Sequence, residues 1–246
     1  MMANAMPKSD ELTVALVHGA FADSSSWAGV IERLQAADVP VKALVNPLRG
    51  VSADSAYVAS AMRQIPGRVL AVAHSYGGAV ITNAATTAEN VVGLVYVAAF
   101  APDEGETLLD IEGRSTDSAL APALRQSEYP WGDGSAPSVE VSIDPDHFHE
   151  VFAGDLPQEE SAVMAASQRP AAMAGFAEKT GAPAWKMLPS WAVVATADRA
   201  AGTDVVRSMA QRAGAQITEV DASHVAMISN PDVVADVVLA ARNTLN

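Results

Sequence analysis

The sequence predicts an α/β fold in which a mostly parallel sheet is flanked by helices and a helical lid is inserted near the middle of the chain. Strand-like and helix-like segments alternate up to residue 101 and again from residue 190. The strand-like runs are apolar throughout, as expected when helices cover both faces of a parallel sheet. This alternation fails between residues 102 and 189. We therefore expect residues 1–101 and 190–246 to form the core and residues 102–189 to form the lid.

The expected strands are short apolar runs, most of them rich in valine and bounded by turn signals. In chain order they are residues 12–18, 40–45, 68–74, 91–98, 191–196 and 215–220. The expected helices lie between and after them, at residues 27–34, 52–64, 76–88 and 204–213 and from residue 230 onward. The first helix has an apolar face at i, i+3, i+4 and i+7, and the last one opens with Asn230-Pro231, a cap residue followed by proline at the first helical position.

The segment 102–189 is rich in acidic residues, proline and glycine, and none of it has the pattern of a convincing strand. Helix-like pieces lie near residues 146–153, 157–168 and 171–180. Insertions in an α/β sheet usually sit at the carboxyl ends of the strands, where ligands bind. We therefore interpret this segment as a mostly helical lid over a ligand site.

Composition excludes several classes of function. The 246 residues include 29 acidic and 15 basic ones, which gives a net charge of −14, and there is no cysteine. Thiol catalysis, disulfides and cysteine-based metal sites are therefore excluded, and the missing basic stripe argues against nucleic-acid binding. No apolar run has the length of a membrane-spanning helix, and the amino terminus lacks a secretory signal, so we expect a cytoplasmic protein without a membrane partner. The sequence leaves the oligomeric state open.

Ser75 is the candidate nucleophile. It stands in Ala73-His74-Ser75-Tyr76-Gly77, between an apolar strand and a helix. A turn tight enough to lift a serine clear of the sheet needs small residues two positions before and after it, and Ala73 and Gly77 meet that need. The alternative is an ordinary helix-capping serine.

His224 is the candidate general base for this serine. It follows the expected strand 215–220, so it should emerge at the carboxyl end of the sheet, on the same edge as Ser75. The other histidines of the chain are His18, His74, His147 and His149. The side chain of His74, next to the nucleophile, should point away from Ser75 and support the turn.

Asp198 is the candidate acid that would orient the histidine. It comes directly after the strand 191–196, and Asp103, which follows the strand 91–98, is its competitor. The oxyanion of a tetrahedral intermediate also needs two backbone donors. The N–H groups of Tyr76, at a helix amino terminus, and of Ala20, in the loop after the first strand, are the candidates.

Five segments together resemble a known family. They are VHGAFADSSSW (17–27), AHSYGG (73–78), VYVAAFAPDEGE (95–106), ATAD (195–198) and SHVAMISNP (223–231). In this order they resemble the α/β-hydrolase superfamily, in particular the branch of small cofactor-free esterases related to methylsalicylate-type esterases and hydroxynitrile lyases. The resemblance implies an α/β-hydrolase fold, places the triad on Ser75, Asp198 and His224, and places the oxyanion hole on Ala20 and Tyr76.

We therefore predict a serine hydrolase that cleaves a carboxylic ester, or a related acyl bond, of a small to medium apolar substrate. Phe21, Trp131, Phe148, Phe152 and Trp185 are the candidate substrate-binding residues. We expect no cofactor and no metal, because the cluster Asp144, Asp146, His147 and His149 lacks the spacing of a known metal motif. The alternatives are a lactone or carbon–carbon bond hydrolase, a cofactor-free oxygenase on the same fold, and a ligand-binding receptor with residual activity.

Overall fold

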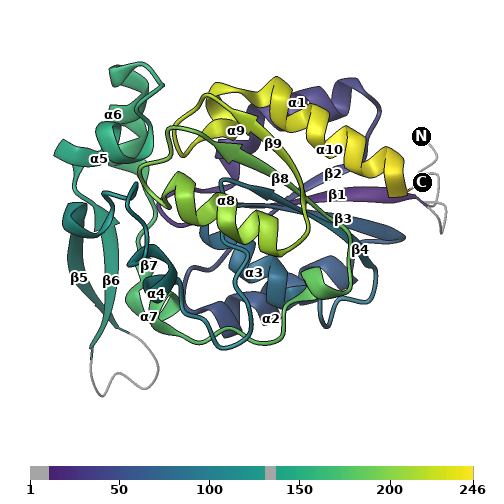
Figure 1. Cartoon of the computed structure of the whole chain (residues 1–246), viewed down its shortest axis with the longest axis horizontal. Coiled ribbons are helices and arrows are strands. Elements are labelled where there is room, and N and C mark those ends of the chain that lie inside the picture. The colour runs from purple at the N-terminus through teal and green to yellow at the C-terminus, as the bar shows by residue number, and fades with distance from the viewer. Residues whose placement is uncertain (1–10, 131–136, 246) are drawn as a thin grey trace, which may run out of the picture.

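A parallel sheet of six strands runs through the centre of the computed structural model, which describes residues 11–130 and 137–245 (Figure 1). The strand order is β2-β1-β3-β4-β8-β9, and every neighbouring pair is parallel. The bounds are β1 Leu12–Val17, β2 Val41–Leu44, β3 Arg68–His74, β4 Val91–Val97, β8 Ser190–Ala195 and β9 Gln216–Val220. The predicted α/β fold with a parallel sheet is confirmed.

Burial along the strands follows their place in the sheet. The central strands β1, β3, β4 and β8 are almost entirely buried, whereas the edge strands β2 and β9 are partly exposed. One row of paired residues crosses four strands, in the order Leu16, Val72, Val95 and Trp191. Because both faces of these strands are covered, their sequences are apolar at every position instead of every second one.

Helices cover both faces of the sheet. The helices of the core are α1 Ala28–Ala36, α2 Val51–Arg63, α3 Tyr76–Ala84, α8 Thr203–Arg212, α9 Ala226–Ser229 and α10 Pro231–Leu245. In Figure 1, α1 and α10 lie side by side on one face of the sheet, and α2 and α3 lie on the other. Asp23 begins the 3-10 turn Ser24–Trp27 that leads into α1, because its side chain accepts the Ser25 N–H.

Among these described helices, none combines the length and the hydropathy that crossing a bilayer would require.

The segment between β4 and β8 differs from the prediction. It contains a second, antiparallel sheet of three strands in the order β5-β6-β7, where a mostly helical lid without strands was expected. Its elements are α4 Leu108–Glu112, β5 Leu124–Pro130, β6 Pro137–Ile143, α5 Pro145–Phe152, α6 Gln158–Ser167, β7 Ala171–Ala172 and α7 Met173–Ala177, with 3-10 turns at Ala121–Ala123 and Ala184–Lys186. The expected helix over residues 171–180 is thus only the short α7.

The period of β6 explains this error. Val139, Val141 and Ile143 alternate with polar residues, and Val141 and Ile143 are buried. An alternation of two is the mark of a strand with one covered face, but it extends over few residues here and its partner β5 is mostly polar. Figure 1 shows β5, β6, α5 and α6 beside the carboxyl ends of the central strands, where a ligand site was expected.

Candidate active site

Ser75 lies at the turn between β3 and α3 with a positive φ of 53°. A non-glycine residue in this region is strained, and such strain concentrates at functional sites. The surrounding backbone comes very close: a Cβ at Gly77 would lie 2.8 Å from the His18 carbonyl oxygen, and a Cβ at Gly78 would lie 2.3 Å from that of Phe100. Only glycine fits at these two positions, so the sequence of α3 allows the tight turn.

Asp198 and His224 form a buried pair at the same end of the sheet. Each is 1% exposed, and the Nδ1 atom of His224 lies 2.8 Å from Oδ2 of Asp198. The other carboxylate oxygen accepts the backbone N–H groups of Ala200 and Ala201 at 2.9 and 3.0 Å. With both oxygens engaged, the carboxylate is fixed in orientation, and the Nε2 atom of the imidazole remains for a second partner.

The His74 side chain contacts His224. Its Nε2 atom lies 3.0 Å from the carbonyl oxygen of His224, and the two rings are 4.6 Å apart between centroids. Burial lowers the pKa of His74 well below its usual value, so the ring is neutral and donates its Nε2–H to that carbonyl. This contact holds the backbone of His224, and a supporting role of His74 in the turn at Ser75 stays a prediction.

Ser75 and His224 are brought to the same region by these contacts. Among the described residues, however, no hydrogen bond joins the Ser75 hydroxyl to the imidazole of His224. In enzymes without a bound substrate, hydrogen bonds between nucleophile and base are often longer than in the reacting complex.

The loop after β1 lies directly against Ser75. A Cβ at Gly19 would be 2.7 Å from the Cβ of Ser75, so only glycine allows this approach. Within the described chain, the N–H of Ala20 has no hydrogen-bond partner. The N–H of Tyr76 belongs to the first turn of α3, where amides lack an intrahelical acceptor. The Ala20 N–H, next to Gly19, and the Tyr76 N–H, next to Ser75, remain the predicted oxyanion donors.

The Tyr76 side chain is held by a buried carboxylate that sequence reasoning missed. Its hydroxyl donates to Oδ2 of Asp54 at 2.8 Å. Asp54 also accepts the backbone N–H groups of Arg49 and Gly50 at the start of α2. Burial raises the pKa of Asp54, and burial likewise raises the pKa of Tyr76. Nothing in the sequence signals this pair, because α2 and α3 are joined by an entire strand.

Aromatic side chains from the inserted segment cover His224. The ring of Phe152 lies 5.0 Å from that of His224, 5.0 Å from that of Phe148 and 6.2 Å from that of Phe21. Phe176 stacks on Phe21 at 6.3 Å and lies 5.6 Å from the Tyr76 ring. Three of the predicted substrate-binding residues therefore meet here, and Phe176, another aromatic residue of the inserted segment, joins them.

Trp185 lies elsewhere. Its indole N–H donates to the carbonyl oxygen of Pro102 at 3.0 Å, and its ring lies 5.3 Å from the ammonium of Lys186 and 5.9 Å from the guanidinium of Arg212. These contacts do not support a place for Trp185 in a substrate pocket. Trp131, another candidate for that pocket, falls outside the described residues.

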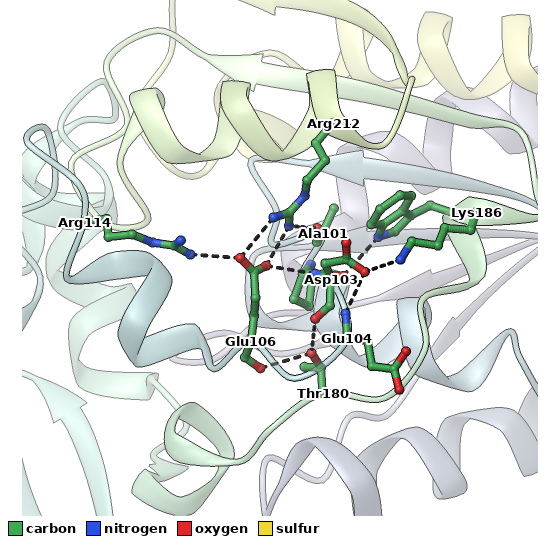
Figure 2. A network of polar contacts seen from close by, with 10 residues as sticks. Ala101, Asp103, Glu104, Glu106, Arg114, Thr180, Lys186 and Arg212 are labelled. Atoms are coloured by element: carbon green, nitrogen blue, oxygen red, sulfur yellow. Dashed lines mark hydrogen bonds and ion pairs between the residues drawn. The ribbon is translucent and has the colours of Figure 1, made fainter.

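The competing acid Asp103 is also engaged elsewhere. Its Oδ1 atom accepts from the Lys186 ammonium at 2.5 Å and from the Glu104 N–H at 2.7 Å (Figure 2). The bond with Lys186 lowers the pKa of Asp103. The structure thus brings Asp198 to the histidine and places Asp103 in a separate network of charged groups.

The cluster of Asp144, Asp146, His147 and His149 lies at the start of α5, where Asp144 caps the helix. Asp144 accepts the Asp146 N–H and pairs with Arg125 at 2.6 Å. No group of three or more potential metal ligands comes together within residues 11–130 and 137–245.

The comparisons with known proteins place this chain in a family. Residues 14–237 match the α/β-hydrolase family, to which the chain therefore belongs. No curated protein gives a significant match.

Similar solved structures carry the names of ester-cleaving and related enzymes. Polyneuridine aldehyde esterase is 20% identical and superimposes with a TM-score of 0.78 over 95% of this chain and 100% of its own. The methylesterase MES16 from Arabidopsis is 20% identical, with a TM-score of 0.76 over 95% of this chain and 100% of its own. A pyrethroid hydrolase from Sphingobium faniae JZ-2 is 21% identical, with a TM-score of 0.75 over 93% and 96%. At these identities the likeness concerns the fold.

Proposed function

We propose that this protein is a serine hydrolase that cleaves a carboxylic ester, or a related acyl bond, of a small to medium apolar substrate. The observation that carries the proposal is the buried pair of Asp198 and His224 at the sheet edge where Ser75 occupies a strained turn. A serine hydroxyl needs a base, and the base needs an oriented tautomer. The names of the similar structures, two esterases and a pyrethroid hydrolase, are consistent with this reaction class.

The first half of the reaction makes the acyl-enzyme. Oγ of Ser75 attacks the carbonyl carbon of the ester, and its proton passes to Nε2 of His224. The N–H groups of Ala20 and Tyr76 donate to the resulting oxyanion. When the tetrahedral intermediate collapses, the bond to the alcohol oxygen breaks and Nε2 returns the proton to that leaving group.

The second half releases the acid. Water loses a proton to Nε2 of His224, attacks the acyl carbon and displaces Ser75, which regains its proton from the imidazole. Throughout, Oδ2 of Asp198 accepts the Nδ1–H of His224 and stabilises the imidazolium. Because Ser75 is 7% exposed and His224 is 1% exposed, the charges form in a site from which most water is excluded, where hydrogen bonds to the oxyanion are stronger.

Active-site labelling tests the nucleophile. A fluorophosphonate probe should label the protein, and Ser75→Ala should abolish both the labelling and the turnover of p-nitrophenyl acetate. Loss of the nucleophile lowers kcat by about 10³–10⁶-fold. Ser60→Ala, an exposed serine on α2, is the matched control and should retain both signals. Wild-type esterase rates in Ser75→Ala would reject the proposal, and a wild-type protein that neither labels nor hydrolyses would favour the receptor alternative.

A further inference from the structure

A groove lies between the loop and helix that follow β1 and the helix α6 of the inserted segment. Its volume is about 420 Å³, which is within the usual size of small-molecule sites. Its apolar lining consists of Phe21, Ala22, Ala28, Val163, Met164 and Ile228. Val163 is 67% exposed. The groove thus offers apolar surface that the protein itself does not cover.

The polar side chains of the groove have little left to offer a ligand. The hydroxyls of Ser25 and Ser26 donate to Asp23, each at 2.6 Å, and that of Ser167 donates to the Val163 carbonyl at 2.9 Å. The amide of Gln168 likewise donates to backbone carbonyls, at 2.8 and 3.0 Å. A polar or anionic ligand would therefore find no free side-chain donor there.

The charges along the groove also favour an uncharged, apolar ligand. Asp23 and Glu160 contribute carboxylates, and no lysine or arginine belongs to the lining. Hydrogen bonds from Ser25 lower the pKa of Asp23, so it is charged at neutral pH. Arg169, which follows the lining residue Gln168, also lowers the pKa of Asp23, so the two carboxylates oppose a ligand carboxylate only in part, whereas an uncharged apolar group meets the lining of Val163 and Met164.

The inner end of the groove borders the candidate active site at two points. Phe21 follows Ala20, and its ring lies 6.2 Å from that of Phe152, which covers His224. Phe21 is itself held at a positive φ of 61°, and its N–H donates to the carbonyl oxygen of Arg169, two residues after the end of α6. On the other side, the N–H of Ile228 donates to the carbonyl oxygen of Val225, the residue after His224.

We infer that this groove binds one of the two substituents of the ester, an uncharged alkyl or aryl group, while the carbonyl lies at Ser75. The inference rests on the proposed function and makes it more specific: the substrate is a neutral ester with one extended apolar arm. Val163 and Met164 of α6 set the length of that arm. The same chemistry could come from the acyl part or from the alcohol part, and the experiment separates the two.

Filling the groove tests this inference. Val163→Trp and Ser167→Trp each place a large ring in the groove, at positions exposed enough to accept it without unfolding. Ala166→Trp, on the same helix but outside the lining, is the control. Each protein is assayed with p-nitrophenyl esters of increasing acyl length and with alkyl acetates of increasing alcohol length. Thermal melting of each variant verifies the fold.

The expected result is a loss of kcat/KM that is confined to long esters. Relative to Ala166→Trp, both groove variants should lose on the order of tenfold in the ratio of kcat/KM for long esters of one series to kcat/KM for p-nitrophenyl acetate, since a methylene or two in an apolar site is worth about that factor. Loss in the first series assigns the groove to the acyl part, and loss in the second assigns it to the alcohol part. If kcat/KM depended on ester length in the same way in both groove variants and in Ala166→Trp, the inference would be wrong. Failure of the wild-type protein and of Ala166→Trp to hydrolyse even the acetate would instead reject the proposed function.

A charged substrate gives a second measurement. An ester whose long arm ends in a carboxylate should be hydrolysed more slowly than its neutral primary-amide counterpart of equal length. Glu160→Gln should narrow that difference at low ionic strength, where the exposed charge is least screened. A wild-type preference for the carboxylate would contradict an apolar, anion-repelling groove.

Discussion

Replacing Glu106 by glutamine should destabilise the protein. The inserted segment is connected to the core by an entering and a leaving stretch of chain, and the Glu106 carboxylate links these two stretches with the core. Glu106 accepts two hydrogen bonds from Arg212 at the end of α8, at 3.0 and 2.7 Å, and one from Arg114 at 3.0 Å (Figure 2). Its backbone carbonyl accepts the N–H of Thr180, so the entering and leaving chains of the segment meet beside it. Glutamine has the same shape but removes the charge and directs an amide N–H₂ at one of these cations.

The magnitude follows from the shift in proton affinity. The hydrogen bonds from Arg212 lower the pKa of Glu106 from 4.5 to about 2. Without solvent screening, that difference in pKa would contribute about 3 kcal/mol to the free energy of unfolding at neutral pH. The Glu106 side chain is 19% exposed and that of Arg212 is 36% exposed, so solvent screening reduces the contribution to about 1–2 kcal/mol. For a chain of this length we expect Tm to fall by roughly 3–6 °C.

The pH dependence distinguishes the charge from a mere packing defect. Because the pKa of the carboxyl is lower in the folded state, its contribution is present above the unfolded value near 4.5 and disappears as the pH falls toward about 2. The difference in Tm between the wild type and Glu106→Gln, measured by calorimetry, should therefore be constant from pH 7 to about pH 5 and then shrink.

The control is Glu219→Gln, which breaks an exposed pair with Arg207 and should leave Tm nearly unchanged. Equal Tm values for the wild type and Glu106→Gln at pH 7 would refute the reasoning. So would a difference that stays undiminished at the lowest pH at which both proteins still fold.

Two further predictions concern the site. Asp198→Asn should lower kcat for p-nitrophenyl acetate by up to about 10⁴-fold, because the amide cannot hold the imidazole of His224 in the productive tautomer. Asp103→Asn should leave kcat within a few-fold of the wild-type value. If steady-state assays gave the opposite ranking, the acid would be Asp103. Gly19→Ala should abolish labelling and turnover at unchanged protein yield, because the added methyl would lie 2.7 Å from the Cβ of Ser75; an active, readily labelled Gly19→Ala protein would show that the loop does not lie against the nucleophile.

Local sequence patterns were sufficient for the core elements. The runs 68–74 and 191–196 are apolar at every position because both of their faces are buried, and that property can be read without knowledge of neighbours. The turn around Ser75 could be predicted for the same reason, since the small residues it requires are adjacent in the chain. The alternation in β6 was also present in the sequence, but three apolar positions beside a polar partner strand were too weak a pattern to identify it.

The choice between two aspartates shows where sequence reasoning ends. Asp103 and Asp198 both follow a strand of the sheet, so chain position alone cannot distinguish them. In the fold, β8 and β9 are neighbours, which brings Asp198 within 2.8 Å of His224, while Asp103 turns toward Lys186. The bond between Asp54 and Tyr76 and the position of Trp185 likewise depend on which elements pack together.

The sequence by itself determined the parallel α/β core, the absence of thiol chemistry, and the residue types and order of a serine, an aspartate and a histidine at strand ends. These depend on backbone preferences and burial that act over a few adjacent residues. Only the tertiary structure decided which carboxylate meets the histidine, which aromatic rings cover it, and that a groove opens between α1 and α6. Those features join residues that lie far apart in the chain, and they exist only once the strand order β2-β1-β3-β4-β8-β9 is set.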